Sequence, residues 1–226
     1  MFFKTCMKIA LKTVVLTIGI LMTISAFGYF FWYKPTFIKP SKSNAFAFKP
    51  VKTAGKEETM LRIHNKVTRV KDYLTVNRMD NTHCFLIDMR IPSGQNRFFV
   101  YNLDKDSVEI AGLVTHGSGL KNNTDSPVFS NTPNSNCTSL GKYKIGKPYD
   151  GKFGLAYKLY GLDTTNSRAF DRFVVLHAHE CVPNSEVYPL TICESWGCPT
   201  VSLAFLVQLK AYIKVSSKPI LLWIYH

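Results

Sequence analysis

The sequence predicts a mainly β domain, a sandwich or barrel with a few helices, preceded by an N-terminal transmembrane helix. From residue 84 onward, short apolar runs recur at near-regular spacing, and turn-forming Gly, Pro, Asn and Asp residues separate them. This pattern is typical of an all-β domain, whereas alternating βαβ units would place helical patterns between the strands. At 226 residues, 46% of them hydrophobic, the chain is long enough for one domain with a real core and an appendage.

The first 33 residues have the pattern of a membrane anchor. Three lysines precede the uncharged run Thr13–Tyr33, whose 21 residues would span about 30 Å as a helix, enough to cross the hydrocarbon core of a bilayer. Aromatic residues crowd the end of this run, as they do at membrane interfaces. We expect an uncleaved signal anchor, with a cleaved signal peptide as the alternative, because the run is long and lacks a clear small-residue exit. Residues 34–56, with three prolines, are expected to form a semi-extended linker.

The net charge of +13 is unevenly distributed along the chain. Nine of the 28 basic residues lie in residues 1–56, which contain no acidic residue, and the other 19 share residues 57–226 with 15 acidic ones. A nucleic-acid reader would concentrate basic charge in its folded domain, so we expect no nucleic-acid partner. The basic arm suits contact with anionic lipid or cell-wall polymer, and a solvated linker is the simpler interpretation. The expected domains are residues 1–33, 34–56 and 57–226.

Two helices are predicted in the folded part. Residues 57–79 begin with acidic and end with basic residues, and their apolar residues recur at spacings of three and four: Met60, Ile63, Val67, Val70 and Leu74. His64 in this helix is interpreted as a surface histidine. The second helix, residues 203–214, follows Ser202, a good N-cap, and has an apolar stripe of Phe205, Leu206, Leu209 and Ile213.

The predicted strands are the apolar runs between turn signals. The turn signals include Pro-Ser-Gly, Asp-Lys-Asp, Gly-Ser-Gly, a polar loop at 121–138 and Lys-Pro-Tyr-Asp-Gly at 147–151. The strands are expected at Cys84–Met89, Phe98–Leu103, Val108–Thr115, Leu140–Ile145, Phe153–Leu159, Phe173–His177 and Ile220–Tyr225.

Reactive side chains are densest between residues 173 and 202. The run Phe173–Leu176 is continuously apolar, so we expect a strand buried on both faces. Alternation along that strand places His177 and His179 on the same face as Phe173. Because a catalytic base is best held at the end of a rigid element, His177 is the predicted general base.

Cys198 is the predicted nucleophile. It lies between Gly197, which permits close backbone approach, and Pro199, which disfavours helical geometry in the residue before it. A nearby imidazole and the N-terminus of the following helix would stabilise a thiolate, since a free thiol with a pKa of about 8.5 is mostly protonated at neutral pH. The backbone amides of Gly197 and Cys198 are the expected oxyanion hole.

The same stretch allows three other interpretations. One is a metal site, with an uncommon ligand spacing, formed by His177, His179, Cys181, Cys193 and Cys198. Another is structural, because outside the cytoplasm a disulfide could join Cys181 to Cys193, or Cys84 to Cys137. In the third, His179 replaces His177 as the base, since both lie on one face of the strand.

His177, followed after seventeen residues by Ser195-Trp196-Gly197-Cys198, resembles the signature of the YkuD-like L,D-transpeptidase family, a histidine followed by Ser/Thr-x-Gly-Cys. The resemblance is to the murein L,D-transpeptidase catalytic domain subgroup, whose motif ends in Ser-Trp-Gly-Cys-Pro. Several motifs in family order are more specific than one short signature. Across residues 57–226 these motifs are Leu86-Ile87-Asp88, Pro92-Ser93, Arg97–Val100, Thr115–Gly119, Phe129-Ser130-Asn131, Thr138–Tyr143, Gly151–Gly154, Gly161-Leu162 and Val174–His177.

The resemblance implies an L,D-transpeptidase-like catalytic domain in the bacterial cell envelope, outside the cytoplasmic membrane, or secreted if the N-terminus is cleaved. The Cys198 thiolate would attack the carbonyl of the third residue of a peptidoglycan stem tetrapeptide, and His177 would protonate the leaving D-alanine. An amine of a neighbouring stem would resolve the thioester to a 3→3 cross-link, and water would make the enzyme an L,D-carboxypeptidase. No metal or cofactor is implied. The residues expected to line the site are His116, His179, Ser195 and Trp196.

Two departures from the family pattern bear on the site. The better-studied branch has a histidine at the position of Trp196, and an arginine or asparagine where this chain has Pro199-Thr200-Val201. That arginine is associated with binding of a substrate carboxylate, so this chain must bind the carboxylate in another way. Cys193 lies five residues before Cys198, and a disulfide between them would act as a redox gate. The alternatives to an enzyme are an inactive cell-wall-binding protein on the same fold and a zinc-binding module.

Overall fold

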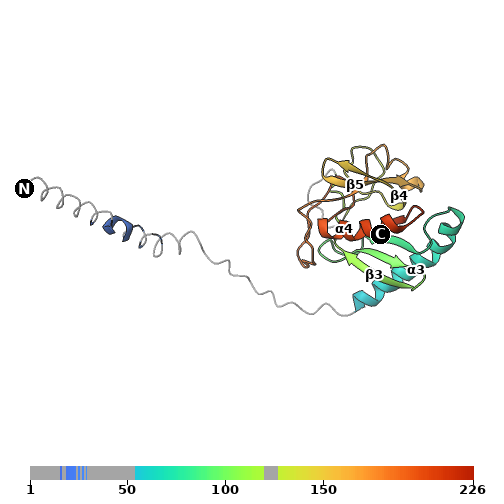
Figure 1. The fold of residues 1–226 in the computed structure, drawn as a ribbon, viewed down its shortest axis with the longest axis horizontal. Coiled ribbons are helices and arrows are strands. Elements are labelled where there is room, and N and C mark those ends of the chain that lie inside the picture. The colour runs from blue at the N-terminus through green and yellow to red at the C-terminus, as the bar shows by residue number, and fades with distance from the viewer. Residues whose placement is uncertain are drawn as a thin grey trace, which may run out of the picture. The chain divides into compact units, whose positions relative to one another are not determined.

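The protein is described by a computed structural model (Figure 1), which covers residues 54–119 and 127–226 and, ahead of them, residues 16, 19–23, 25, 27 and 29. The expected signal anchor and linker lie mostly outside these described residues. Among the residues that are described, no helix combines the length and the apolar character needed to cross a bilayer. The unit Thr53–His226 is compact, and it contains the elements discussed below.

The helix predicted at residues 57–79 is confirmed as α3, Ala54–Val76. Its apolar stripe is buried against one face of the sheet, and Ile63 and Val70 have no solvent exposure. His64 lies on the exposed side of the helix, with its ring edge-on to Tyr101 at 6.3 Å between centroids. The spacing of apolar residues therefore predicts both the helix and its buried face.

The strands form a single sheet in the described residues. They are β1 (His83–Asp88), β2 (Phe98–Asn102), β3 (Ser107–Gly112), β4 (Gly141–Gly151), β5 (Gly154–Gly161), β6 (Val175–Ala178), β7 (Thr200–Val201) and β8 (Leu221–Tyr225). Their order across the eight-stranded sheet is β3-β2-β1-β8-β4-β5-β6-β7. Neighbours are antiparallel except for the pairs β1–β8 and β6–β7, which are parallel.

Seven strands match predicted runs, and three details differ. β4 continues through residues 147–151, so the turn predicted there is wrong; the chain reverses only at Lys152 and Phe153. Phe173 is not in a strand: it is 83% exposed, and its φ of 55° is in the left-handed region. β7 is not predicted, because its two residues are too short to show a period.

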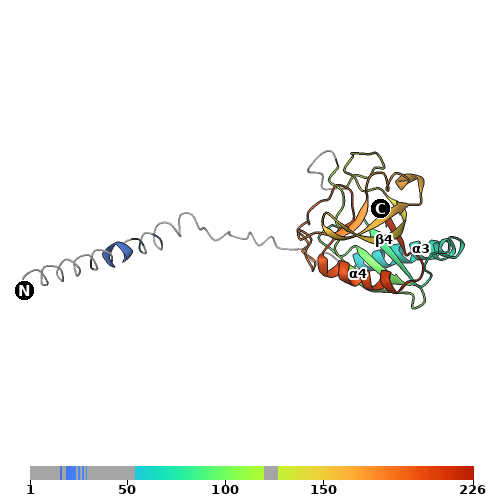
Figure 2. The ribbon, with the colours of Figure 1, turned by 45° about the horizontal axis from the view of Figure 1, so that its top comes forward.

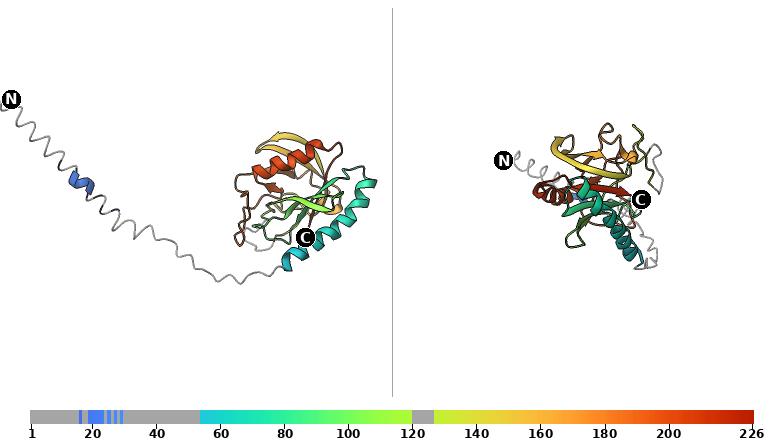
Figure 3. Two further views of the ribbon diagram at one scale, coloured as in Figure 1. Left: turned by 60° about the horizontal axis from the view of Figure 1, so that its bottom comes forward. Right: turned by 90° about the vertical axis from the view of Figure 1, so that its right-hand side faces the viewer.

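Alternate residues of the central strand β1 enter two different cores. Phe85 and Ile87 face a core shared with α4 (Leu203–Val215), while Cys84 and Leu86 face the core under α3. The two helices therefore cover opposite faces of the central strands, as the left view of Figure 3 shows, and Figure 2 shows β4 above them. The predicted cap of α4 is confirmed, since the Phe205 amide donates to Ser202 Oγ at 3.2 Å.

The two edges of the sheet meet near the reactive stretch. The amide of Thr115, just beyond edge strand β3, donates to the carbonyl of Thr200 in edge strand β7 at 2.9 Å. The Thr200 amide returns a bond to Thr115 Oγ1 at 3.1 Å. These bonds curl one sheet toward closure. The mainly β domain with a few helices is confirmed, in the form of one curled sheet instead of two packed sheets.

Candidate active site

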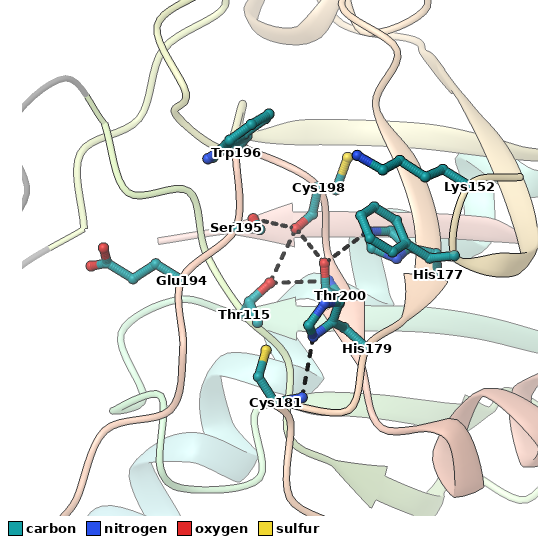
Figure 4. Close-up of a pocket in the computed structure, with 11 residues that line it drawn as sticks. Thr115, Lys152, His177, His179, Cys181, Glu194, Ser195, Trp196, Cys198 and Thr200 are labelled. Atoms are coloured by element: carbon teal, nitrogen blue, oxygen red, sulfur yellow. Dashed lines mark hydrogen bonds between the residues drawn. The ribbon is translucent and has the colours of Figure 1, made fainter.

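A cavity of about 450 Å³ opens where the sheet edges meet, and it brings together most of the predicted site residues (Figure 4). Five of them line it: His177, His179, Ser195, Trp196 and Cys198. Trp196 is 84% exposed at the rim, where a ligand would meet it first. Sequence positions 177 and 198 therefore converge on one cavity, as the motif predicts.

The loop that carries Cys198 is held on both sides by backbone bonds. The Ser195 amide donates to the His116 carbonyl at 2.9 Å, and the Ser118 amide donates to the Ser195 carbonyl at 2.9 Å. Inside the loop, Ser195 Oγ accepts the Gly197 amide at 3.1 Å and donates to the Cys198 carbonyl at 2.7 Å. Ser195 therefore shapes the turn in front of the cysteine.

Gly197 is required by the backbone of this turn. Its φ is 109°, and a Cβ placed there would lie 2.6 Å from the Cys137 carbonyl oxygen. The close approach predicted for this glycine is thus made to the protein's own backbone. The Gly197 amide, one of the two expected oxyanion-hole donors, is already bonded to Ser195 Oγ and would have to exchange that partner for a substrate oxygen.

The Cys198 thiol points at the backbone before β6. Sγ donates to the carbonyl oxygen of Phe173 at 3.8 Å. Burial raises the pKa of the Cys198 thiol above its usual value, and a bond with the Val175 backbone and the charge of Arg172 oppose the rise. The thiol is therefore protonated at neutral pH, contrary to the prediction of a stabilised thiolate, because desolvation outweighs the nearby positive charge.

His177 is held in one tautomer by its own strand. Its Nδ1 lies 3.0 Å from the Ala178 carbonyl oxygen, which can only accept, so Nδ1 carries the proton and Nε2 is the free base. The Phe153 ring stacks on the imidazole, 5.1 Å between centroids and 17° between planes. Burial lowers the pKa of His177 below its usual value, the bond to Ala178 raises it, and His179 lowers it further. The ring is therefore neutral at pH 7.

Thr200 links the histidine to the cysteine. Its hydroxyl lies 3.1 Å from His177 Nε2 and 3.4 Å from the Cys198 carbonyl oxygen. The same carbonyl accepts from Thr115 Oγ1 at 3.2 Å. The contacts between His177 and the Cys198 backbone thus run through Thr200, within the segment Pro199-Thr200-Val201 where this sequence departs from the better-studied branch.

The other two histidines differ in their placement. His179 lines the cavity, and its Nδ1 accepts the Cys181 amide at 3.2 Å. His116 is not among the lining residues: it lies behind the loop, 3.0 Å from Arg97 Nη2 and 3.5 Å from Glu194 Oε1. Burial and the charge of Arg97 lower the pKa of His116 to about 4, so it is neutral at pH 7. His116 contacts the site through its carbonyl, which anchors Ser195, and through its ring, which lies beside Glu194.

The cysteines decide between the alternative interpretations. Cys181 and Cys193 form a disulfide, whereas Cys84 and Cys137 are buried and free. A redox gate between Cys193 and Cys198 is therefore wrong, because Cys193 is already paired. The ligand set of the zinc alternative is broken by the same disulfide, and the described residues contain no group of three or more His, Cys, Asp or Glu placed to hold a metal ion.

Several lining residues are absent from the sequence prediction. Lys152 and Phe153 form the β4–β5 turn, and Glu194 precedes the serine of the signature. The Gly151–Gly154 motif contains Lys152 and Phe153. Their position beside His177 depends on the length of the β4–β5 hairpin, which the motif does not reveal. The other two are Thr115, beside edge strand β3, and Thr200, in the segment already noted as a departure.

One family model and several solved structures are similar to this chain. No curated protein sequence matches the chain. Among solved structures, an L,D-transpeptidase from Xylanimonas cellulosilytica is 14% identical with a TM-score of 0.36, over 63% of this chain and 60% of that one. The helical cell shape determining protein Pgp2 from Campylobacter jejuni is 11% identical with a TM-score of 0.43, over 64% and 48%. This chain therefore spans less than two thirds of either.

The third similar structure is the Ldtfm–avibactam carbamoyl enzyme, 11% identical with a TM-score of 0.40, over 64% of this chain and 49% of that one. The family assignment rests on sequence. The sequence model of the family described as L,D-transpeptidase catalytic domain matches residues 56–225, which include every described strand, α4 and all of α3 except its first two residues. The chain belongs to the L,D-transpeptidase catalytic domain family.

Proposed function

We propose that the protein is a cysteine acyltransferase of peptidoglycan remodelling, which cleaves a stem tetrapeptide after its third residue and transfers the acyl group to an amine or to water. One observation carries the proposal. The cavity combines a thiol, Cys198, with an imidazole, His177, whose Nδ1 proton is committed to a backbone carbonyl, so that Nε2 is the available proton acceptor.

In the proposed first half-reaction, Cys198 Sγ leaves the Phe173 carbonyl and bonds to the substrate carbonyl carbon. Because thiol and imidazole are both neutral at rest, the thiol proton moves to His177 Nε2 as the bond forms. The carbon–nitrogen bond to the terminal D-alanine then breaks, and Nε2 returns the proton to the leaving amine. A thioester on Cys198 remains.

In the second half-reaction, an acceptor amine or a water molecule attacks the thioester. It loses a proton to His177 Nε2, which passes it to the departing sulfur and restores the resting thiol. The Cys198 amide is the proposed oxyanion donor, with the Gly197 amide as a second donor if Ser195 Oγ releases it. Thr200 holds the Nε2 side of the ring between turnovers.

The experiment that tests this function is digestion of purified muropeptides with the full-length protein. We expect tetrapeptide stems to lose D-alanine, giving tripeptides if water is the acceptor and 3→3 linked dimers if a neighbouring amine is. Mass spectrometry of the products separates the two. Binding to cell-wall material without either product would instead assign the inactive wall-binding alternative.

Two charges in the cavity are proposed to orient the substrate. In the view of Figure 4, Lys152 and Glu194 lie on opposite sides of Cys198. Lys152 has no ion-pair partner among the described residues, so its ammonium group is available for the carboxylate of the leaving D-alanine. Glu194 suits the amino group of a diamino acid.

Replacing Lys152 with alanine is therefore expected to raise KM for a tetrapeptide up to about fivefold while changing kcat less, because an exposed ion pair contributes up to about 1 kcal/mol and positions the substrate more than it activates it. Steady-state kinetics on a synthetic stem peptide measure this. Lys71→Ala, at an exposed lysine on α3, is the matched control. Equal KM values for the two variants would remove Lys152 from substrate binding.

The proposed location is the bacterial cell envelope, with residues 1–33 as a signal anchor in the cytoplasmic membrane. The uncharged run Thr13–Tyr33 supports the anchor. The Cys181–Cys193 disulfide supports a compartment outside the cytoplasm, because disulfides persist in oxidising environments. Alkaline carbonate extraction tests the anchor: release of the full-length protein into the soluble fraction would contradict it.

A further inference from the structure

A second cavity, of about 730 Å³, lies away from Cys198 and shares no lining residue with the first. It is formed by β4, β5, the end of α4 and the turn that leads into β8. We call it the lysine groove, because four of its lining residues are Lys144, Lys147, Lys158 and Lys218. No aspartate or glutamate lines it, and none of the four lysines belongs to an ion pair among the described residues.

Aromatic rings lie beside two of these lysines, Lys144 and Lys158. Tyr160 stacks on Phe170 with centroids 5.3 Å apart and planes 12° apart. Gly146 leaves space for the Tyr160 ring, since a Cβ at Gly146 would lie 2.7 Å from Tyr160 Cε2. Lys144 Nζ lies 5.0 Å from the centre of the Tyr160 ring. The cation and the rings thus form one built surface on the outer side of the hairpin.

The second lysine is held in the same manner. Lys158 Nζ lies 5.0 Å from the centre of the Phe170 ring and 5.8 Å from that of Tyr149. Cation–π contacts fix the lysine stems along the rings while the ammonium groups keep free hydrogen-bond donors. The groove therefore presents several unneutralised cations at set positions beside aromatic faces.

We propose that the lysine groove is a binding site for an anionic polysaccharide. The ring of Tyr149 would pack against the apolar face of a sugar ring, and the lysines would pair with carboxylate or phosphate groups along the polymer. Charge complementarity supports an anionic occupant. Residues 57–226 are nearly neutral, with 19 basic against 15 acidic residues, yet four lysines and no acidic residue line the groove. That near balance also disfavours nucleic acid, whose phosphates need a long basic track.

One hairpin connects the two cavities. The strands β4 and β5 line the lysine groove, and the turn between them, with Lys152 and Phe153, lines the cavity at Cys198. A polymer held along the strands would therefore lie on the element that ends at the proposed catalytic site. The groove does not depend on the proposed acyl transfer, because none of its residues reaches Cys198.

The test measures binding of the full-length protein in detergent to defined probes by isothermal titration calorimetry. The probes are a carboxymethylated cello-oligosaccharide, a phosphorylated manno-oligosaccharide, a neutral cello-oligosaccharide, polyphosphate and single-stranded DNA. We expect one or both charged sugars to bind, and the preferred one identifies carboxylate or phosphate as the ligand group. Lys144→Gln/Lys158→Gln should weaken binding about tenfold.

The matched control is Lys71→Gln/Lys105→Gln, which removes the same charge at exposed lysines outside the groove and should change affinity less than about twofold. Tyr149→Ala should weaken binding to the charged sugars but not to polyphosphate. Cys198→Ala should bind as the wild type does, which separates this site from acyl transfer. Equal losses for both lysine pairs, or tighter binding of polyphosphate or DNA than of either charged sugar, would overturn the proposal.

Discussion

Cys198→Ala is expected to form no covalent adduct with an acylating β-lactam and to lose tetrapeptide turnover by at least about a thousandfold. The reason is that the proposed reaction passes through a thioester on Sγ, and no other thiol lines the cavity among the described residues, since Cys181 is bonded to Cys193. Intact-mass measurement of the protein after incubation gives the adduct, and mass spectrometry of released D-alanine gives the turnover.

The control for this prediction is Cys84→Ala, which removes a free thiol from the core under α3. Burial raises the pKa of Cys84 to about 12, so its thiol stays protonated and unreactive at neutral pH. Cys84→Ala should therefore keep both the adduct and the turnover, with some loss of stability from the small cavity. An adduct that persists in Cys198→Ala would exclude Cys198 as the nucleophile.

His177→Gln is expected to lower kcat by about a hundredfold to ten-thousandfold, the usual contribution of a positioned general base. The pH profile is the sharper readout. Because burial places the pKa of His177 below its usual value, the imidazole stays neutral and active down to a pH below about 6.5, and activity falls as the pH drops through that pKa. The glutamine variant should lose this acidic limb.

His179→Gln is the matched control for the histidine. His179 lines the same cavity and contacts the same Phe153 ring, but its Nδ1 accepts the Cys181 amide and no contact joins it to Thr200. We expect its activity to fall less than about tenfold and its acidic limb to remain. The reverse result, with the limb lost only in His179→Gln, would assign the base to His179.

The fold is largely predictable because its elements carry local signals. Apolar spacing predicts α3 and α4, Ser202 predicts the cap of α4, and apolar runs predict seven strands. The errors occur where tertiary contacts decide. Phe153 continues an apolar run, yet it lies in a turn because β4 extends past Pro148, and its half-exposed ring stacks on His177. β7 exists only through its pairing with β6.

The sequence predicts which residues share the cavity, but it does not predict their protonation. The motif predicts His177 and Cys198 in one cavity, which the structure brings together. The protonation of the thiol follows from burial, which is a property of the packed domain and has no trace in the residues beside Cys198. The lysine groove is hidden for a related reason: its cations come from three separate segments of a nearly neutral domain.

The position of β8 has a consequence for how the chain is made. β8 follows the other seven strands of the described sheet along the chain, yet it pairs with β1 on one side and β4 on the other, in the middle of the sheet. Until it emerges, β1 and β4 have unpaired edges, and both cores lack its residues Leu221, Leu222 and Ile224. The centre of the sheet therefore cannot form until β8 is in place between β1 and β4.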